Sequence, residues 1–291
     1  MTAHRSPPTA DPSLFVDSAM RGAVLVTGAS SGIGAAIVRH LAARGFRVFG
    51  TVRRAEDEAA LERDGVTPVR MDVTDQTSIS RARDQVTAAL GGSPLAGLVN
   101  NAGIPAAGPL ELIPIEEIRQ VLEVNLLGAV AVTQAFLPLL KAARGRIVNI
   151  TSVAGRAALP FMGPYAASKF GLEAISDSLR RELIPVGVKV VVIEPASFQS
   201  RIWNKVEEMD LSRYRGTPYE RVMERVRQGA LMAADHAPPP DKVVSAVERA
   251  LTARRPPIRV VVAPRFMTRV WLWLPDRWLD WVVARGWRKR R

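Results

Sequence analysis

A glycine-rich turn between an apolar run and a helical segment is the feature that most constrains the fold of this chain. The turn reads TGASSGIG over residues 27–34 and joins the apolar run 23–26 to a segment with helical spacing at 33–44. Glycine permits the tight turn, and the helix start offers free N–H groups and a partial positive charge to a pyrophosphate. The spacing is G-x3-G-x-G rather than G-x-G-x-x-G, so a glycine-rich turn without a ligand is the alternative interpretation.

Short apolar runs alternate with helical segments through the rest of the chain. Strands are predicted at 23–26, 46–51, 66–71, 95–99, 146–150, 189–194 and 258–262, and helices at 33–44, 75–90, 115–142 and 165–183. Near-continuous runs of Val, Ile and Leu are typical of parallel strands that are covered on both faces. We therefore expect an α/β fold with a doubly wound parallel sheet and helices on both of its faces.

The composition of the segments predicts one large domain with two extensions. Residues 1–20 are polar and Pro-containing and are expected to form a flexible arm, and 21–263 to form a single domain. Within that domain, residues 196–237 interrupt the alternation and end before Pro238, so we expect a lid over the substrate. Residues 264–291 form an extension rich in Trp and Arg.

The bulk composition narrows the chemistry. The chain has 291 residues, a formal net charge of +12, no cysteine and three scattered histidines. Disulfides and thiolate metal sites are excluded, and we expect no metal site. The positive charge raises the question of nucleic acid, but no nucleic-acid-binding motif supports it, so we expect no nucleic-acid partner.

Three polar residues after the predicted fifth strand form the pattern S-x12-Y-x3-K: Ser152, Tyr165 and Lys169. Tyr165 and Lys169 share one face of a helix, where the ammonium is expected to lower the pKa of the phenol and so favour proton transfer. Ser152 is placed to hydrogen-bond a substrate oxygen as charge develops on it. Asn125 lies in a helical segment, where it is expected to hold a water that links Lys169 to solvent.

The end of the second strand addresses the choice of cofactor. Residues 46–55 contain no acid that would hold the ribose 2′-OH of NAD, whereas Arg53 and Arg54 can hold a 2′-phosphate. This favours NADP(H) over NAD(H), and the alternative is that both are ordinary surface arginines. Asp72 either contacts the adenine or caps the next segment. The Asn-Asn-Ala-Gly run at 100–103 is either a plain turn or part of the cofactor site.

With these motifs the chain resembles the short-chain dehydrogenase/reductase family over roughly residues 21–200. The resemblance implies a Rossmann-type fold with a seven-stranded sheet. It also implies that Tyr165 is the acid/base, that Ser152 orients the substrate, that Lys169 binds the nicotinamide ribose, and that Asn125 belongs to a proton relay. The cofactor-binding positions are Gly28, Ser30, Ser31, Gly32, Ile33, Gly34, Arg53, Arg54, Asp72, Val73, Asn101, Ala102, Gly103, Tyr165, Lys169, Pro195, Phe198 and Ser200.

The chain departs from the family pattern after the sixth strand. Ala196 replaces the usual glycine and Ser200 the usual threonine. Serine keeps a hydroxyl for a carboxamide, whereas alanine is expected to restrict the backbone beside the nicotinamide.

Apolar residues near the predicted site indicate a lipophilic substrate. They are Phe161, Met162, Phe198, Ile202, Trp203, Met209, Leu211 and Met232. The run Ile193-Glu194-Pro195 and the long lid resemble the hydroxysteroid and retinol dehydrogenase branches. We expect reduction of a ketone or aldehyde on a steroid, retinoid or acyl chain. The alternatives are an NAD(H)-dependent alcohol dehydrogenase of a small substrate and a non-catalytic dinucleotide-binding regulator.

The C-terminal extension concentrates five of the six tryptophans between Trp271 and Trp287, among arginines. This composition suits a membrane–water interface, so residues 265–291 are a candidate for peripheral membrane contact. Packing of this segment on the body or on a second subunit is the alternative. The resemblance also implies a homodimer or homotetramer through the helices at 115–142 and 165–183. We expect a cytoplasmic protein, with any membrane association peripheral.

Overall fold

The computed structural model describes residues 22–199, 207–263 and 275–288. The predicted arm at 1–20 lies outside these residues, as do Ser200, Ile202 and Trp203. The division into one domain, a lid and an extension stays a prediction.

Seven parallel strands form one sheet in the order β3-β2-β1-β4-β5-β6-β7. The strands are β1 (Ala23–Val26), β2 (Arg47–Val52), β3 (Thr67–Arg70), β4 (Leu95–Asn100), β5 (Arg146–Ile150), β6 (Lys189–Pro195) and β7 (Arg259–Val262). The strand order reverses between β1 and β4, which is where a doubly wound sheet opens a crevice for a ligand. The predicted Rossmann-type sheet is confirmed.

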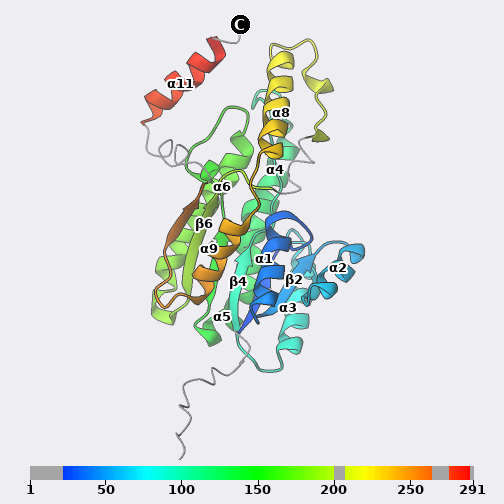
Figure 1. Cartoon of the computed structure of the whole chain (residues 1–291), viewed down its shortest axis with the longest axis vertical. Coiled ribbons are helices and arrows are strands. Elements are labelled where there is room, and N and C mark those ends of the chain that lie inside the picture. The colour runs from blue at the N-terminus through cyan, green and yellow to red at the C-terminus, as the bar shows by residue number, and fades with distance from the viewer. Residues whose placement is uncertain (1–21, 200–206, 264–274, 289–291) are drawn as a thin grey trace, which may run out of the picture.

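Helices cover both faces of the sheet (Figure 1). One face is covered by α1 (Gly32–Ala43) and α9 (Asp241–Thr252), and the other by α3 (Gln76–Leu90), α5 (Gly128–Ala143) and α6 (Gly163–Glu182). The alternating Val, Ile and Leu side chains of the strands therefore fill two cores, one under each layer. The remaining described helices are α2 (Glu58–Arg63), α4 (Ile115–Leu122), α8 (Glu220–Asp235) and α11 (Asp276–Arg288), with short turns η2 (Ala55–Asp57), η3 (Glu123–Leu127), η4 (Val153–Gly155), η5 (Ile184–Val186) and η6 (Ser212–Tyr214).

The helix predicted at 115–142 is interrupted. A π-helical turn, η3, separates α4 from α5 and places an extra residue in the backbone spiral. The whole stretch Ile115–Ala143 is long and apolar enough to cross a membrane by length and composition alone. In this fold its α5 part packs on β4 and α3 and buries Val132, Phe136 and Leu140, as a core helix does.

The segment predicted as a lid carries its own structure after β6. It contains η6 and α8, and α8 lies at the same end of the molecule as α4 (Figure 1). Three contacts hold it there: Arg213 pairs with Glu117 of α4, the Tyr219 hydroxyl donates to Glu111 at 2.7 Å, and the Tyr219 ring meets Phe161 edge-on at 6.2 Å.

Candidate active site

The glycine turn between β1 and α1 has the shape of a phosphate cradle. Gly28 (φ 66°) and Gly32 (φ 55°) adopt left-handed backbone conformations that favour glycine. A Cβ on Gly34 would lie 2.1 Å from the Gly28 oxygen and 2.5 Å from Asn101 Nδ2, so only glycine fits there. Ser31 precedes α1 without a side-chain capping bond, and the helix presents its N-terminal amides to the crevice. These features fit a pyrophosphate.

The end of β4 locks this turn in place. Asn101 Nδ2 donates to the Thr27 and Gly28 carbonyls at 3.0 and 3.1 Å, and the Asn101 and Ala102 amides both donate to Thr27 Oγ1. The Asn101 side chain therefore fixes the backbone of the glycine turn. The preceding Asn100 is buried and donates to Thr133 and Asn149, which joins β4 to β5 and α5.

The two arginines after β2 have different surroundings. Arg54 is paired with Glu56 at 2.9 Å and with Asp57 at 3.5 Å. Among the described residues Arg53 has no ion pair within salt-bridge distance, although its charge helps to lower the pKa of Asp72. The larger cause of that lowered pKa is the backbone N–H of Thr74, which donates to Asp72 Oδ1 at 2.9 Å. Arg53 is thus better placed than Arg54 for a 2′-phosphate.

Asn125 lies inside the π-helical turn η3 and is almost wholly buried. Its amide forms a closed pair with Ile104, accepting from the backbone N–H at 2.8 Å and donating to the carbonyl at 2.9 Å. It also donates to Ser168 Oγ at 3.1 Å. A Cβ on Gly103 would contact both Asn125 Oδ1 and Lys169 Nζ, which places these groups around one point.

Ser152 follows β5 and begins the short turn η4. Its Oγ accepts from the Ala154 amide at 3.1 Å and donates to the Pro195 carbonyl at 3.4 Å, at the end of β6. The Ser152 hydroxyl also opposes the effect of burial on the pKa of Tyr165. The hydroxyls of Ser152 and Tyr165 therefore lie where the ends of β5 and β6 meet the start of α6.

Tyr165 and Lys169 lie one turn apart on α6, and Lys169 Nζ is 5.7 Å from the centre of the tyrosine ring. The ammonium donates to the Ile150 carbonyl at 3.0 Å. Burial raises the pKa of Tyr165, and burial lowers the pKa of Lys169 to about 8. The pKa of the phenol is therefore raised overall rather than lowered as expected, because burial is the largest effect on it.

The departure at Ala196 causes no backbone strain. Ala196 does not have a positive φ, and its amide donates to the Val262 carbonyl at 2.9 Å, which continues the pairing of β6 with β7. Alanine is therefore accommodated at the family's glycine position. Pro195 ends β6, and Phe198 is buried beyond it.

Sequence reasoning missed three features near this site. The π-helical turn at Asn125 has no distinctive spacing, and Phe161 takes a left-handed backbone (φ 68°) that composition does not reveal. Glu173 forms a buried ion pair behind Lys169. Its spacing of four residues from Lys169 on a predicted helix was the available signal.

Comparison with known proteins agrees with this geometry. A family model described as short chain dehydrogenase matches residues 22–211. An NADPH-dependent 3-dehydrocapnine reductase of Ornithobacterium rhinotracheale is 37% identical, over 93% of this chain and 98% of that protein. A mitochondrial D-beta-hydroxybutyrate dehydrogenase of Rattus norvegicus is 35% identical, over 82% of this chain and 76% of its own length. Retinol dehydrogenase 5 of Mus musculus is 36% identical, with 90% and 89% covered.

A solved structure shares the architecture. A short-chain dehydrogenase from Streptomyces avermitilis superposes with a TM-score of 0.73 at 30% identity, covering 92% of this chain and 96% of that one. The likeness extends over the sheet and both helical layers.

Proposed function

This chain belongs to the short-chain dehydrogenase family and is an oxidoreductase that acts on CH–OH groups, and we propose that it uses NADP(H) to interconvert a lipophilic ketone or aldehyde and its alcohol. The observation that carries the proposal is the convergence of Ser152, Tyr165 and Lys169 beside the glycine cradle. A dinucleotide-binding regulator would need the cradle but not the buried proton-transfer residues.

The cradle residues Gly28, Gly32 and Gly34, with the α1 N-terminus, would hold the pyrophosphate. Asp72 would contact the adenine, and Arg53 the 2′-phosphate. Lys169 would bind the nicotinamide ribose. When bound, NADPH supplies a hydride to the carbonyl carbon of the substrate.

Tyr165 gives its phenolic proton to the substrate oxygen as charge builds there, and takes a proton back in the direction of oxidation. Ser152 holds the same oxygen by a hydrogen bond and so stabilises the developing charge. The Lys169 ammonium favours the phenolate that remains. The Asn125 side chain is fixed by its two hydrogen bonds to the backbone of Ile104. It would hold a water that links Lys169 to solvent.

The segment after β6 supports a lipophilic substrate. Tyr214 and Met223 are buried in this segment, and Phe161 meets Tyr219 where it approaches α6. The relative named for retinol supports an apolar substrate, whereas the relative named for hydroxybutyrate keeps a small alcohol substrate as a second candidate.

A substrate panel assayed with NADPH and NADH in parallel separates these candidates. The proposal predicts turnover of steroid, retinoid or acyl-chain carbonyls, faster with NADPH. Turnover confined to small polar alcohols with NADH would favour the second candidate, and none with any substrate would favour the regulator.

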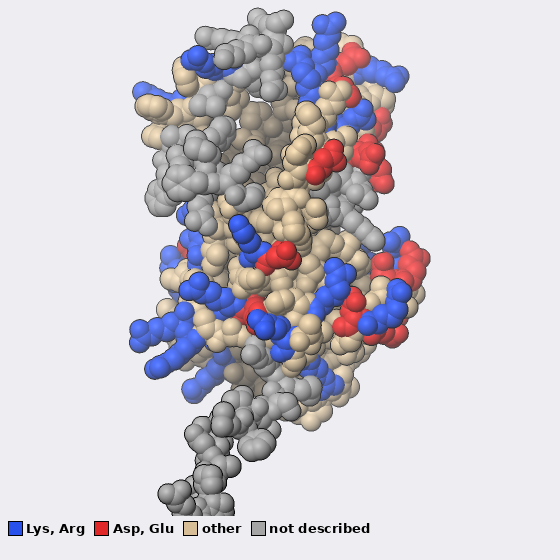
Figure 2. Space-filling view, in the orientation of Figure 1, with Lys and Arg blue, Asp and Glu red and all other residues tan. Residues whose placement is uncertain are grey.

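We also propose peripheral membrane contact through residues 265–291, on an otherwise cytoplasmic protein. Of this range the structure describes 275–288. Trp278 and Trp281 of α11 are exposed, and the Arg285 guanidinium lies 5.1 Å from the centre of the Trp281 ring. On the face shown in Figure 2, acidic side chains lie among the basic ones on the right, whereas the lower left is mostly basic. Recovery only in the unbound fraction after flotation with anionic vesicles at low salt would contradict the contact.

A homodimer or homotetramer through α5 and α6 is proposed as well. Phe170 and Ile175 of α6 and Leu127 beside α5 are exposed apolar side chains in the single chain. Light scattering tests this proposal, and a monomer at micromolar concentration would contradict it.

A further inference from the structure

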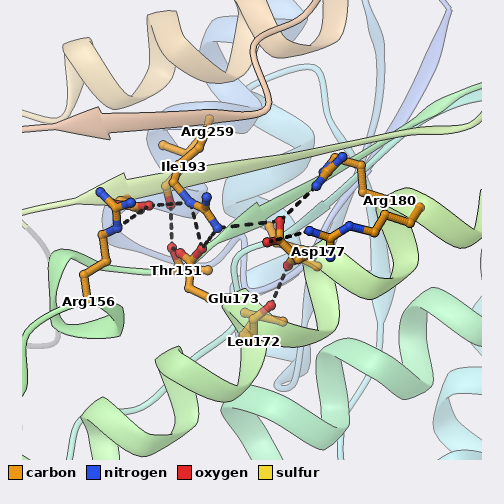
Figure 3. A network of polar contacts seen from close by, with 12 residues as sticks. Thr151, Arg156, Leu172, Glu173, Asp177, Arg180, Ile193 and Arg259 are labelled. Carbon is orange, nitrogen blue, oxygen red and sulfur yellow. Dashed lines mark hydrogen bonds and ion pairs between the residues drawn. The ribbon is translucent and has the colours of Figure 1, made fainter.

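A buried cluster of charged side chains lies behind the candidate catalytic residues, and the mechanism above does not use it (Figure 3). It joins four elements: Thr151 follows β5, Glu173 lies on α6, Glu194 on β6 and Arg259 on β7. Arg156, after η4, reaches it from the surface. Buried charges are costly unless they are paired, so such a cluster calls for a role.

Glu173 is the centre of this cluster. Its Oε1 accepts from Thr151 Oγ1 at 2.6 Å, and its Oε2 accepts from Arg259 Nε and Nη2 at 3.0 and 2.7 Å. The side chain is only 10% exposed. Because both carboxylate oxygens have fixed donors, the orientation of Glu173 is set by β5 and β7 together.

Glu173 also lies against both parts of the catalytic constellation. It follows Lys169 by one helical turn, on the same face of α6. A Cβ on Gly155, in the turn that Ser152 begins, would lie 3.2 Å from the Lys169 carbonyl and 3.3 Å from Glu173 Cγ. The turn that Ser152 begins therefore packs on α6 beside Lys169 and Glu173. Thr151, which precedes Ser152, holds the start of this turn there by its hydrogen bond to Glu173.

Glu194 shares the same guanidinium. Its Oε1 lies 2.8 Å from Arg259 Nε, but that N–H is directed to Glu173, and neither oxygen of Glu194 has a hydrogen-bond partner among the described residues. Arg156 Nε lies 3.6 Å away. Arg259 thus lies against two buried carboxyl groups, and it hydrogen-bonds only that of Glu173.

We propose that Glu173, held by Arg259 and Thr151, is a positioning residue that sets the electrostatic surroundings of Lys169 and fixes the Ser152 turn against α6. The inference rests on the proposed function, since it concerns the same site. It makes β7, far along the chain from the catalytic residues, part of the apparatus that controls their reactivity.

The charges around Lys169 support this role. Tyr165 and Glu173 of α6 are its charged or titratable neighbours on the described elements, with Arg156, Glu194 and Arg259 behind Glu173. Asn125 and the Ile150 carbonyl contribute only dipoles. Burial lowers the pKa of Lys169, and the Glu173 carboxylate opposes that effect. Removing the carboxylate should therefore let Lys169 lose its proton at lower pH.

Glu173→Gln tests the proposal, because the amide keeps the shape of the side chain without its charge. The measurement is the pH profile of kcat/KM for NADPH, which follows the ionisation of the free enzyme. We expect its alkaline limb to move to lower pH by about one unit, and Glu173→Asp to move it less. A purely structural role would lower kcat/KM equally at every pH.

Asp177→Asn is the matched control. Asp177 is a further turn along α6 and lies 3.7 Å from Arg259, but it makes no contact with Thr151. We expect its profile to overlay that of the wild type. If Glu173→Gln does not fold, Glu173→Asp is the second test, because it keeps the charge, draws it away from Lys169 and should still move the same limb, by a smaller amount.

An unmoved alkaline limb in a folded Glu173 variant would overturn the inference. The proposed function is judged separately, by whether Tyr165→Phe abolishes turnover. A chain in which Tyr165→Phe is inactive and Glu173→Gln has the wild-type profile is an enzyme in which Glu173 has no positioning role.

Discussion

Lys169 Nζ lies 5.7 Å from the centre of the Tyr165 ring and donates its hydrogen bond to the Ile150 carbonyl, not to the phenol. The ammonium therefore acts on Tyr165 through its charge, at close range and in a desolvated place. Its protonation state should govern the reactivity of the phenol.

This relationship predicts a pH limit on activity. Burial lowers the pKa of Lys169 to about 8, so the ammonium is present below that pH and is lost as pH rises through it. We expect kcat/KM for NADPH to fall about tenfold per pH unit above the limb. A profile that stays flat up to pH 10 would show that Lys169 keeps its charge and would contradict the prediction.

The different surroundings of the two arginines after β2 predict different effects on cofactor choice. Arg53→Ala should weaken NADPH binding by about 10- to 100-fold, because a charge-assisted bond to the 2′-phosphate is lost, and should leave NADH nearly unchanged. Arg54→Ala is the control, since Arg54 is already paired with Glu56 and Asp57. Fluorescence titration measures both affinities, and equal losses for NADPH and NADH at Arg53 would argue against phosphate recognition.

The close approach at the cradle predicts a steric effect. In Gly34→Ala the new methyl group would meet the Gly28 carbonyl and Asn101, so we expect a loss of stability of about 1–3 kcal/mol and weak NADPH binding. Gly229→Ala is the matched control, because it lies exposed in α8 with open space around it and should gain up to about 1 kcal/mol. Thermal unfolding of both variants decides, and a Gly34→Ala protein as stable as the wild type would refute the packing argument.

The buried carboxyl of Glu194 predicts a pH-dependent stability. Burial, with the charge of Glu173, raises its pKa from 4.5 to about 7. The folded state then holds a proton that the unfolded state has released, so this contribution is complete below pH 4.5 and is lost as pH rises through 7. Because glutamine does not titrate, the free energy of unfolding of Glu194→Gln should rise relative to that of the wild type between pH 5 and pH 8, by on the order of 1–3 kcal/mol. Melting temperatures of the variant and the wild type that change in parallel with pH would rule out a titrating Glu194.

The sequence specified the sheet and most of the site because both depend on local patterns. Apolar runs marked all seven strands, and the glycine turn, Ser152, Tyr165 and Lys169 were visible from spacing alone. The helices α2, α8 and α9 and the break at η3 were not predicted.

The electrostatics of the site depended on tertiary contacts instead. The raised pKa of Tyr165 follows from burial, which a four-residue spacing does not reveal. Glu173 and Arg259 are 86 residues apart in the chain, and no local sequence pattern predicts that they form an ion pair. Ala196 fits its place beside Val262 without a positive φ, and its effect on the backbone beside the nicotinamide stays a prediction.

Tyr165→Phe tests the central claim most directly, because it removes one hydroxyl and leaves the cradle intact. Turnover of a lipophilic carbonyl with NADPH should fall by at least about 100-fold, since the general acid is lost, while the affinity for NADPH stays within about threefold of the wild type. Steady-state kinetics and cofactor titration on the same preparation give both numbers. Unchanged turnover in a folded, NADPH-binding Tyr165→Phe protein would contradict the account.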